Sequence, residues 1–157
     1  MKKQLLHSGW QLTTVGKNDT IPATVPGSVY NDLLNAGRME DPYWRDNEMK
    51  ALALMDEDYR YNTTFDVNAD VLNSERVLLR CEGLDTIADI VLNGEKIASV
   101  CNMHRTWEFD VKDSLKTTGN TLEIVFHSPT KYIKEQDKIC HAGGSDEAMV
   151  GFPNLRK

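Results

Sequence analysis

From residue 59 onward, hydrophobic and polar side chains alternate with a period of two in several short segments. The clearest segment is 59–67, in which every odd position is aromatic or β-branched and every even position is polar. The same alternation recurs in segments 77–81, 107–111 and 122–126. Alternation of this kind is typical of strands with one buried and one exposed face. Turn-forming residues separate the segments, as at 117–120, so the pattern predicts an antiparallel β-sandwich.

The dipeptide Asn93-Gly94 gives the strongest local signal in the chain. It lies between two runs rich in β-branched and apolar residues, 88–92 and 95–100. Asn and Gly both tolerate the positive φ angles that a type I′ turn requires at its two central positions. The sequence therefore predicts a hairpin with a two-residue turn at this point.

One helix is predicted before the strands, and a second follows them. Ser28 can cap the start of the first helix, and Gly37 can end it in the left-handed conformation. Between these ends, an apolar stripe at helical spacing is formed by Tyr30, Leu33 and Leu34. A weaker helical pattern runs from Thr130 to about Lys138, after Pro129. The predicted fold is therefore all-β with one or two short helices.

Length and composition place the chain among ordinary globular domains. Its 157 residues are 40% hydrophobic and 27% charged, which suits one domain whose core needs neither a metal nor a disulfide. The net charge of −6 argues against nucleic acid or an anionic membrane as a partner. No apolar run approaches the roughly 20 residues that span a bilayer. Together with Met1 and the lack of a signal-peptide core, this predicts a cytoplasmic protein.

The residues that could carry chemistry form no complete site. Three cysteines, Cys81, Cys101 and Cys140, match no zinc or redox spacing, so we expect reduced and buried thiols. The four histidines are scattered, and no metal or other cofactor is expected. Acidic residues cluster at 56–58, where a solvated turn is the favoured interpretation. The dipeptide Asn47-Glu48 is the remaining candidate for carboxylate chemistry.

The last segment, 141–157, has little strand or helix periodicity and contains three glycines and one proline. A domain usually closes its last element before it stops. We therefore expect this segment to be a loop-like tail of an excised piece of a longer protein, with a disordered tail as the alternative.

Several segments in the same order resemble the β-mannosidases of glycoside hydrolase family 2. The resemblance covers about residues 8–157. The segments that carry it are 22–34, 41–48, 58–65, 83–94, 109–111, 119–122, 151–153 and Arg156-Lys157. Segment 83–94 resembles a sheet motif shared by the N-terminal domains of the whole family, whereas the motifs 26–30 and 41–43 favour β-mannosidases over β-galactosidases and β-glucuronidases.

The resemblance implies a jelly-roll β-sandwich of the galactose-binding-like type, the N-terminal sugar-binding domain of the family. In the intact enzymes an immunoglobulin-like domain and a catalytic (β/α)₈ barrel follow, and terminal non-reducing β-D-mannose is removed by a retaining mechanism. Both catalytic glutamates belong to the barrel. The chain is therefore predicted to hold no catalytic residue and to be inactive alone, and Asn47-Glu48 is not the catalytic pair because it lies in an N-terminal motif.

Two residues are the candidates for contact with substrate, Arg156 and Trp44. An arginine can hold a sugar hydroxyl or a carboxylate, although an inter-domain ion pair or a place in the tail is the favoured interpretation for Arg156. For Trp44 and its neighbour Tyr43, packing in an interface is favoured over stacking on sugar. The expected partners are a β-mannoside in the intact enzyme and the downstream domains of the same chain.

Two alternatives remain open at the level of sequence. The first is a free-standing carbohydrate-binding module, because jelly rolls often bind sugars. The second is the N-terminal domain of a β-galactosidase or β-glucuronidase, because those relatives share the sheet motif.

Overall fold

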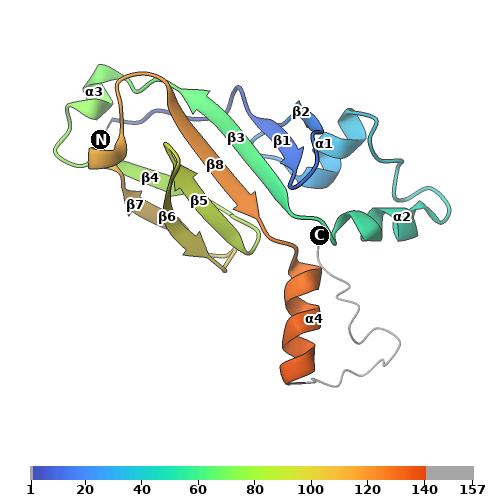
Figure 1. Ribbon diagram of the computed structural model, residues 1–157. Helices are drawn as coiled ribbons and strands as arrows, with labels where there is room; N and C mark the ends of the chain where they lie inside the picture. Colours follow the sequence, from blue (N-terminus) through green and yellow to red (C-terminus); the bar gives the residue numbers. More distant parts are fainter. Residues whose placement is uncertain (1, 141–157) are drawn as a thin grey trace.

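The computed structural model describes residues 2–140, and most of its strands belong to one six-stranded antiparallel sheet (Figure 1). The order across this sheet is β2-β1-β3-β8-β5-β6. Its strands are β1 (Gln11–Thr14), β2 (Thr20–Pro22), β3 (Tyr59–Phe65), β5 (Ala88–Leu92), β6 (Glu95–Val100) and β8 (Asn120–Phe126). A second antiparallel sheet pairs β4 (Leu78–Cys81) with β7 (Trp107–Asp110).

Strands β3 and β8 form the middle of the larger sheet and pair along their whole lengths, from Tyr59 opposite Phe126 to Phe65 opposite Asn120. The predicted alternation is confirmed, because Tyr59, Tyr61 and Thr63 are buried while the residues between them are more exposed. All four alternating segments found in the sequence contain a strand. The short strands β1 and β2 were not predicted from the sequence.

The hairpin predicted at Asn93-Gly94 joins β5 to β6, and φ is 52° at Asn93 and 83° at Gly94. The Asn93 side chain donates to the Ser114 carbonyl oxygen at 2.7 Å and to Asn120 Oδ1 at 3.0 Å. Asn120 is fully buried at the start of β8. The turn residue therefore also ties the hairpin to the middle of the sheet.

The two sheets share one hydrophobic core. Ile90 and Leu122 from the larger sheet are buried in the same cluster as Cys81 from the smaller one. Burial raises the pKa of the Cys81 thiol to about 11. The thiols of all three cysteines are free, but only Cys81 is buried. The prediction of buried thiols is wrong for Cys101 and Cys140, which follow the last residues of β6 and α4 and lie at the surface.

Helix α1 (Val29–Asn35) begins and ends as predicted. The Ser28 hydroxyl accepts from the Asn31 N–H at 3.3 Å, and Gly37 has a φ of 67° just beyond the last turn. The predicted apolar stripe is only partly correct, because the Leu34 side chain is 40% exposed. The buried positions of the helix are Asp32 and Leu33.

Asp32 is a carboxylate with 2% exposure, and its burial is matched by hydrogen bonds. Its oxygens accept from the Tyr61 hydroxyl at 2.8 Å and from the Thr24 N–H at 3.0 Å. Burial, followed by the bond to Asp32, raises the pKa of Tyr61. These contacts fix α1 against β3 and the segment that follows β2.

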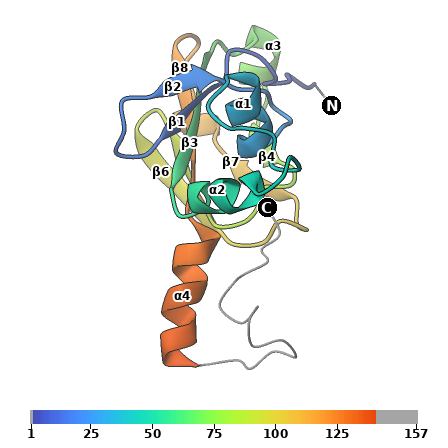
Figure 2. The same ribbon diagram turned by 90° about the vertical axis from the view of Figure 1, so that its right-hand side faces the viewer.

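The described residues contain four α-helices rather than the predicted one or two, because α2 (Asn47–Leu54) and α3 (Ala69–Leu72) were missed. A short 3₁₀ helix covers Lys112–Ser114. The helix predicted near Thr130 is confirmed as α4 (Pro129–Ile139). It continues past β8 and projects away from both sheets, at the end of the molecule where α2 also lies (Figures 1 and 2). None of the helices within 2–140 is long and apolar enough to cross a membrane.

Candidate functional site

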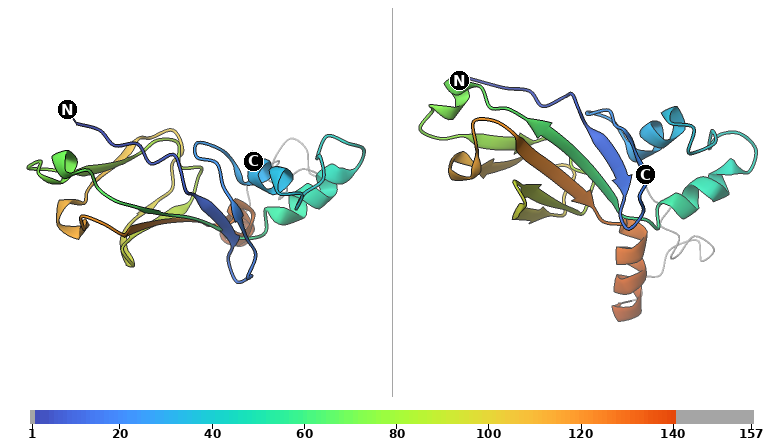
Figure 3. Two further views of the ribbon diagram at one scale, coloured as in Figure 1. Left: turned by 90° about the horizontal axis from the view of Figure 1, so that it is seen from above. Right: turned by 45° about the horizontal axis from the view of Figure 1, so that its top comes forward.

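The candidate site lies where α2 leads into β3 and β8 leads into α4, so that two projecting helices meet one end of the larger sheet (Figures 1 and 3). A backbone carbonyl group at the end of α2 binds two side chains at the start of α4. The Met55 carbonyl oxygen accepts from Ser128 Oγ at 2.5 Å and from Thr130 Oγ1 at 3.0 Å. Ser128 also caps α4, because its Oγ accepts from the Lys131 N–H at 3.2 Å.

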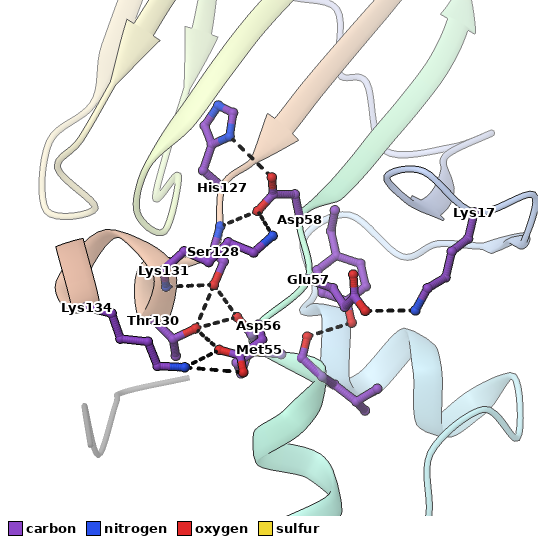
Figure 4. A network of polar contacts seen from close by, with 12 residues as sticks. Lys17, Met55, Asp56, Glu57, Asp58, His127, Ser128, Thr130, Lys131 and Lys134 are labelled. Atoms are coloured by element: carbon purple, nitrogen blue, oxygen red, sulfur yellow. Dashed lines mark hydrogen bonds and ion pairs between the residues drawn. The ribbon is translucent and has the colours of Figure 1, made fainter. Parts of the chain in front are cut away.

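Two carboxylates of segment 56–58 hold the first turns of α4 (Figure 4). Asp56 Oδ1 accepts from Thr130 Oγ1 at 2.6 Å and from Lys134 Nζ at 3.1 Å. The bond from Thr130, and then that from Lys134, lowers the pKa of Asp56. Asp58 Oδ1 accepts from the Ser128 N–H at 2.8 Å and from Lys131 Nζ at 3.3 Å.

Segment 56–58 is a turn, as predicted, and Asp56 is exposed in it. The prediction missed that Asp56 and Asp58 also bind α4. Negative charge at the N-terminus of a helix is favourable, because the unpaired N–H groups there carry partial positive charge. Glu57, between them, points elsewhere and pairs with Lys17 at 2.8 Å. Without the fold, nothing in the sequence relates segment 56–58 to a helix that begins about 70 positions later.

His127 connects the α4 junction, the contacts of residues 55–58 with residues 128–134, to strand β5. Its Nε2 lies 3.1 Å from Asp89 Oδ2, and its Nδ1 lies 3.9 Å from Asp58 Oδ2. Asp89 also pairs with Lys96 at 2.8 Å and accepts from Ser99 Oγ at 2.7 Å. The bonds from Lys96 and Ser99 lower the pKa of Asp89 to about 2. His127 is thus held by carboxylates, as expected for a hydrogen-bonded rather than a ligand histidine.

An exposed aromatic loop precedes α2 at the same end of the molecule. The side chain of Tyr43 is 95% exposed, that of Trp44 63% and that of Met49 67%. The Arg45 guanidinium lies 5.7 Å from the centre of the Trp44 ring, and Arg45 has a φ of 54°, which is unusual outside glycine. Three large apolar side chains are thus exposed within the short segment 43–49. Contact of Trp44 with substrate stays a prediction.

The aromatic loop has a defined backbone. Asp41 Oδ1 accepts from the Tyr43 N–H at 2.9 Å, and the Asp41 carbonyl oxygen accepts from Asn47 Nδ2 at 3.1 Å. The Tyr30 hydroxyl donates to the Ala51 carbonyl oxygen at 2.8 Å, which ties α2 to α1. Asn47 thus supports the loop, and Glu48 lies exposed in the first turn of α2. The other candidate for substrate contact, Arg156, lies outside the described residues.

The site offers no metal centre in the part of the chain that the structure describes: no three His, Cys, Asp or Glu side chains there are grouped to hold an ion. Its acids are paired with lysines, hydroxyls and helix N–H groups. Such an arrangement fixes α4 and the end of α2 against one end of the larger sheet.

Comparison with known proteins places this architecture in one class, the galactose-binding-like domains of glycoside hydrolases. The chain belongs to the family of glycosyl hydrolase 2 galactose-binding domain-like proteins, whose model matches residues 10–157. It is homologous to the N-terminal region of the family 2 β-mannosidases.

The individual relatives carry the name β-mannosidase. The chain is 31% identical to the bovine β-mannosidase over 133 residues, and 38% identical to β-mannosidase A of Emericella nidulans over 122 residues. These matches cover 85% and 76% of this chain but only 15% and 13% of the two relatives. The chain therefore spans about one seventh of the length of these enzymes.

Solved structures agree with the sequence matches. The crystal structure of a β-D-mannosidase from Dictyoglomus thermophilum has a TM-score of 0.85 and 36% identity, over 90% of this chain and 18% of that one. An exo-chitosanase from Amycolatopsis orientalis has a TM-score of 0.65 with 20% identity, over 76% of this chain and 16% of that one. At that identity the second likeness shows a shared fold alone.

Proposed function

We propose that this chain is the scaffold and pocket-edge domain of a β-mannosidase, folded as a jelly-roll β-sandwich. The main support is the likeness to the Dictyoglomus β-D-mannosidase, which combines 36% identity with a TM-score of 0.85 over 90% of the chain. The core shared by the six-stranded and two-stranded sheets agrees with a sandwich. The β-glucuronidase structure from the same organism fits less well, with 19% identity and a TM-score of 0.56.

The parent enzyme would hydrolyse terminal non-reducing β-D-mannose with retention of configuration. That reaction needs two carboxyl groups about 5–5.5 Å apart, one of them an acid with a raised pKa. In this chain hydrogen bonds and ion pairs lower the pKa of Asp56, Asp89 and Asp110 instead. On this proposal the catalytic glutamates lie in another part of the parent enzyme, because this chain covers only 15% of the length of the bovine relative, and the domain alone is inactive.

The contribution of the domain is an interface. Tyr43, Trp44 and Met49 would pack against a downstream domain of the same polypeptide, with Trp44 at the edge of the sugar pocket. Arg156 would lie near the same pocket or form an inter-domain ion pair. The loop is suited to this role because its backbone is fixed by Asp41 and Asn47 while its aromatic rings remain exposed.

A chimaera tests this proposal. Residues 10–157 replace the matching segment of the Dictyoglomus enzyme, and hydrolysis of 4-nitrophenyl β-D-mannopyranoside is measured. We expect an active chimaera, and Trp44→Ala should lower kcat/KM about 10-fold, or about 1.4 kcal/mol. Leu78→Ala is the matched control, because this side chain is also partly exposed, at 38%, but lies on β4. A folded but inactive chimaera, or equal effects of the two substitutions, would contradict the proposal.

A further inference from the structure

Helix α4 has an exposed face that takes no part in the α4 junction. Tyr132, Glu135 and Ile139 follow one another at spacings of three and four, so they lie on one side of the helix. Ile139 is 79% exposed and Tyr132 50%, and Glu135 is exposed as well. The opposite side carries Thr130, which is buried beside the Met55 carbonyl oxygen. Because α4 projects away from both sheets, a partner can approach along this exposed α4 face (Figures 1 and 2).

The contacts of the α4 junction hold the start of the helix and reach as far as Lys134, whereas α4 ends at Ile139. The helix has 11 residues and is about 16 Å long, and a helix of this length is marginal in water unless it packs on something. Burial of the apolar Ile139 side chain against a partner would therefore stabilise the end of the helix as well as the contact itself.

The exposed α4 face also borders an open depression of about 260 Å³ at the base of the helix. Ile87, next to β5, and Tyr132 form the apolar part of its lining. The face thus offers an apolar recess near the start of α4 and a projecting isoleucine at its end. In a pair of antiparallel helices the end of each helix lies beside the start of the other. A second copy of α4 in that orientation brings its Ile139 to the recess of the first, and two-fold symmetry repeats the contact.

The charges of the exposed α4 face are complementary in the same arrangement. Antiparallel pairing about the middle of the helix sets Tyr132 opposite Ile139 of the second copy, and Glu135 next to its Lys138. Glu135 and Lys138 are both exposed, and neither has an ion pair within residues 2–140. Each copy therefore offers one carboxylate and one ammonium group to the other.

An anionic partner such as nucleic acid fits this face less well than a second copy does. Lys131 borders the face, but its charge is balanced by Asp58 at 3.3 Å. The chain as a whole has a net charge of −6, which repels anionic partners. A face that complements itself in both shape and charge is what an isologous interface requires.

We propose that two copies of this chain associate through α4, packed antiparallel about a two-fold axis, with Ile139 of each copy on Tyr132 and Ile87 of the other. One helix about 16 Å long offers less contact than the about 1,200–2,000 Å² of a standard interface, so we expect a weak dimer with a Kd of about 10–100 µM. The dimer goes beyond the proposed function and does not rest on it, because no other domain is needed.

Sedimentation equilibrium of the 157-residue chain, from about 5 to about 500 µM, measures the association. A reducing agent is present throughout, so that the exposed Cys140 cannot link two copies covalently. The mass should rise from 17.8 kDa toward twice that value. Ile139→Ser should raise the Kd at least about 10-fold. Tyr43→Ala is the matched control, because it removes another exposed apolar side chain, 95% exposed, that lies outside α4.

Reversal of the charges tests the antiparallel orientation. Glu135→Lys and Lys138→Glu should each raise the Kd by about 3–10-fold, because each sets like charges against one another at both ends of the interface. The double variant restores opposite charges, so its Kd should return to within about 2-fold of the wild-type value. All of these positions are exposed, so each variant should keep the wild-type circular dichroism spectrum.

A chain that remains monomeric up to about 500 µM would overturn the proposal. So would an unchanged Kd in folded Ile139→Ser. A rise of the Kd in Tyr43→Ala equal to that in Ile139→Ser would assign the contact to the aromatic loop instead. Failure of the double charge reversal to recover association would contradict the antiparallel pairing. None of these results depends on hydrolysis by the chimaera, so the dimer and the proposed function can fail separately.

Discussion

Replacing Asn120 by alanine should destabilise the chain more than any exposed substitution, because this buried amide joins three elements. Its Oδ1 accepts from the Lys116 N–H at 2.8 Å and from Asn93 Nδ2 at 3.0 Å, and its Nδ2 donates to the Lys116 carbonyl oxygen at 2.7 Å. A fourth, longer bond of 3.4 Å reaches the Phe65 carbonyl oxygen. The side chain thus fixes the loop before β8, the β5–β6 hairpin and the end of β3.

The magnitude follows from the groups left behind. A hydrogen bond contributes about 1 kcal/mol net, and an unsatisfied buried partner costs about 1–3 kcal/mol. Three short bonds are lost, but Lys116 is near the surface and water can replace part of them. We therefore expect Asn120→Ala to lower the free energy of unfolding by about 3–5 kcal/mol, a large part of the about 5–15 kcal/mol typical of a domain.

Urea unfolding followed by far-ultraviolet circular dichroism measures this change. For a slope of about 2 kcal/mol per M, the midpoint should fall by about 1.5–2.5 M. Thr121→Ala is the control, since the next side chain along β8 is exposed and should change stability by no more than about 0.5 kcal/mol. A loss below about 1 kcal/mol in Asn120→Ala, or a similar loss in both variants, would refute the reasoning.

Further predictions concern the α4 junction and the fold as a whole. Ser128→Ala removes the cap of α4 and one hydrogen bond to the Met55 carbonyl oxygen. The free energy of unfolding should therefore fall by about 1–3 kcal/mol, and amide hydrogen exchange in α4 should accelerate. An unchanged exchange rate would contradict the role assigned to Ser128. The pKa of Asp89 is lowered from 3.8 to about 2, so the carboxylate stabilises the fold above about pH 4 and this contribution is lost as the pH falls toward 2. Stability measured from pH 5 to pH 2 should therefore converge between the wild type and Asp89→Asn, and a constant difference would count against the ion pair. The chain itself should unfold in one cooperative thermal transition, and a circular dichroism spectrum of a disordered chain would disprove this.

The elements with strong local signals could be predicted from the sequence. Alternation at 59–67 marked β3, Asn93-Gly94 marked the β5–β6 turn, and Ser28 with Gly37 marked both ends of α1. In each case the signal lies within the residues of the element itself. The short strands β1 and β2 carry too few alternating positions to be recognised in this way.

What could not be predicted depends on pairing between distant residues. Helix α2 was missed although Asp46 stands at its N-cap position and Glu48 in its first turn. It is short and buries only Ala51, so it carries no apolar stripe that would mark a helix. The anchoring of α4 by Asp56 and Asp58 requires β3 and β8 to be neighbours, which the sequence does not reveal. Asp32 was overlooked because a buried carboxylate on a helix makes sense only beside the Tyr61 hydroxyl.

The most direct test of the central claim is an assay of the 157-residue chain for β-mannosidase activity. If the domain supplies folding and an interface while the catalytic carboxylates lie elsewhere, the purified chain should release no 4-nitrophenol from 4-nitrophenyl β-D-mannopyranoside above the rate in buffer. The Glu48→Gln variant is measured in parallel, because Glu48 is exposed and belongs to the one Asn-Glu dipeptide of the chain. Equal, background rates in both proteins are the predicted result. Turnover by the wild type that disappears in Glu48→Gln would contradict the account.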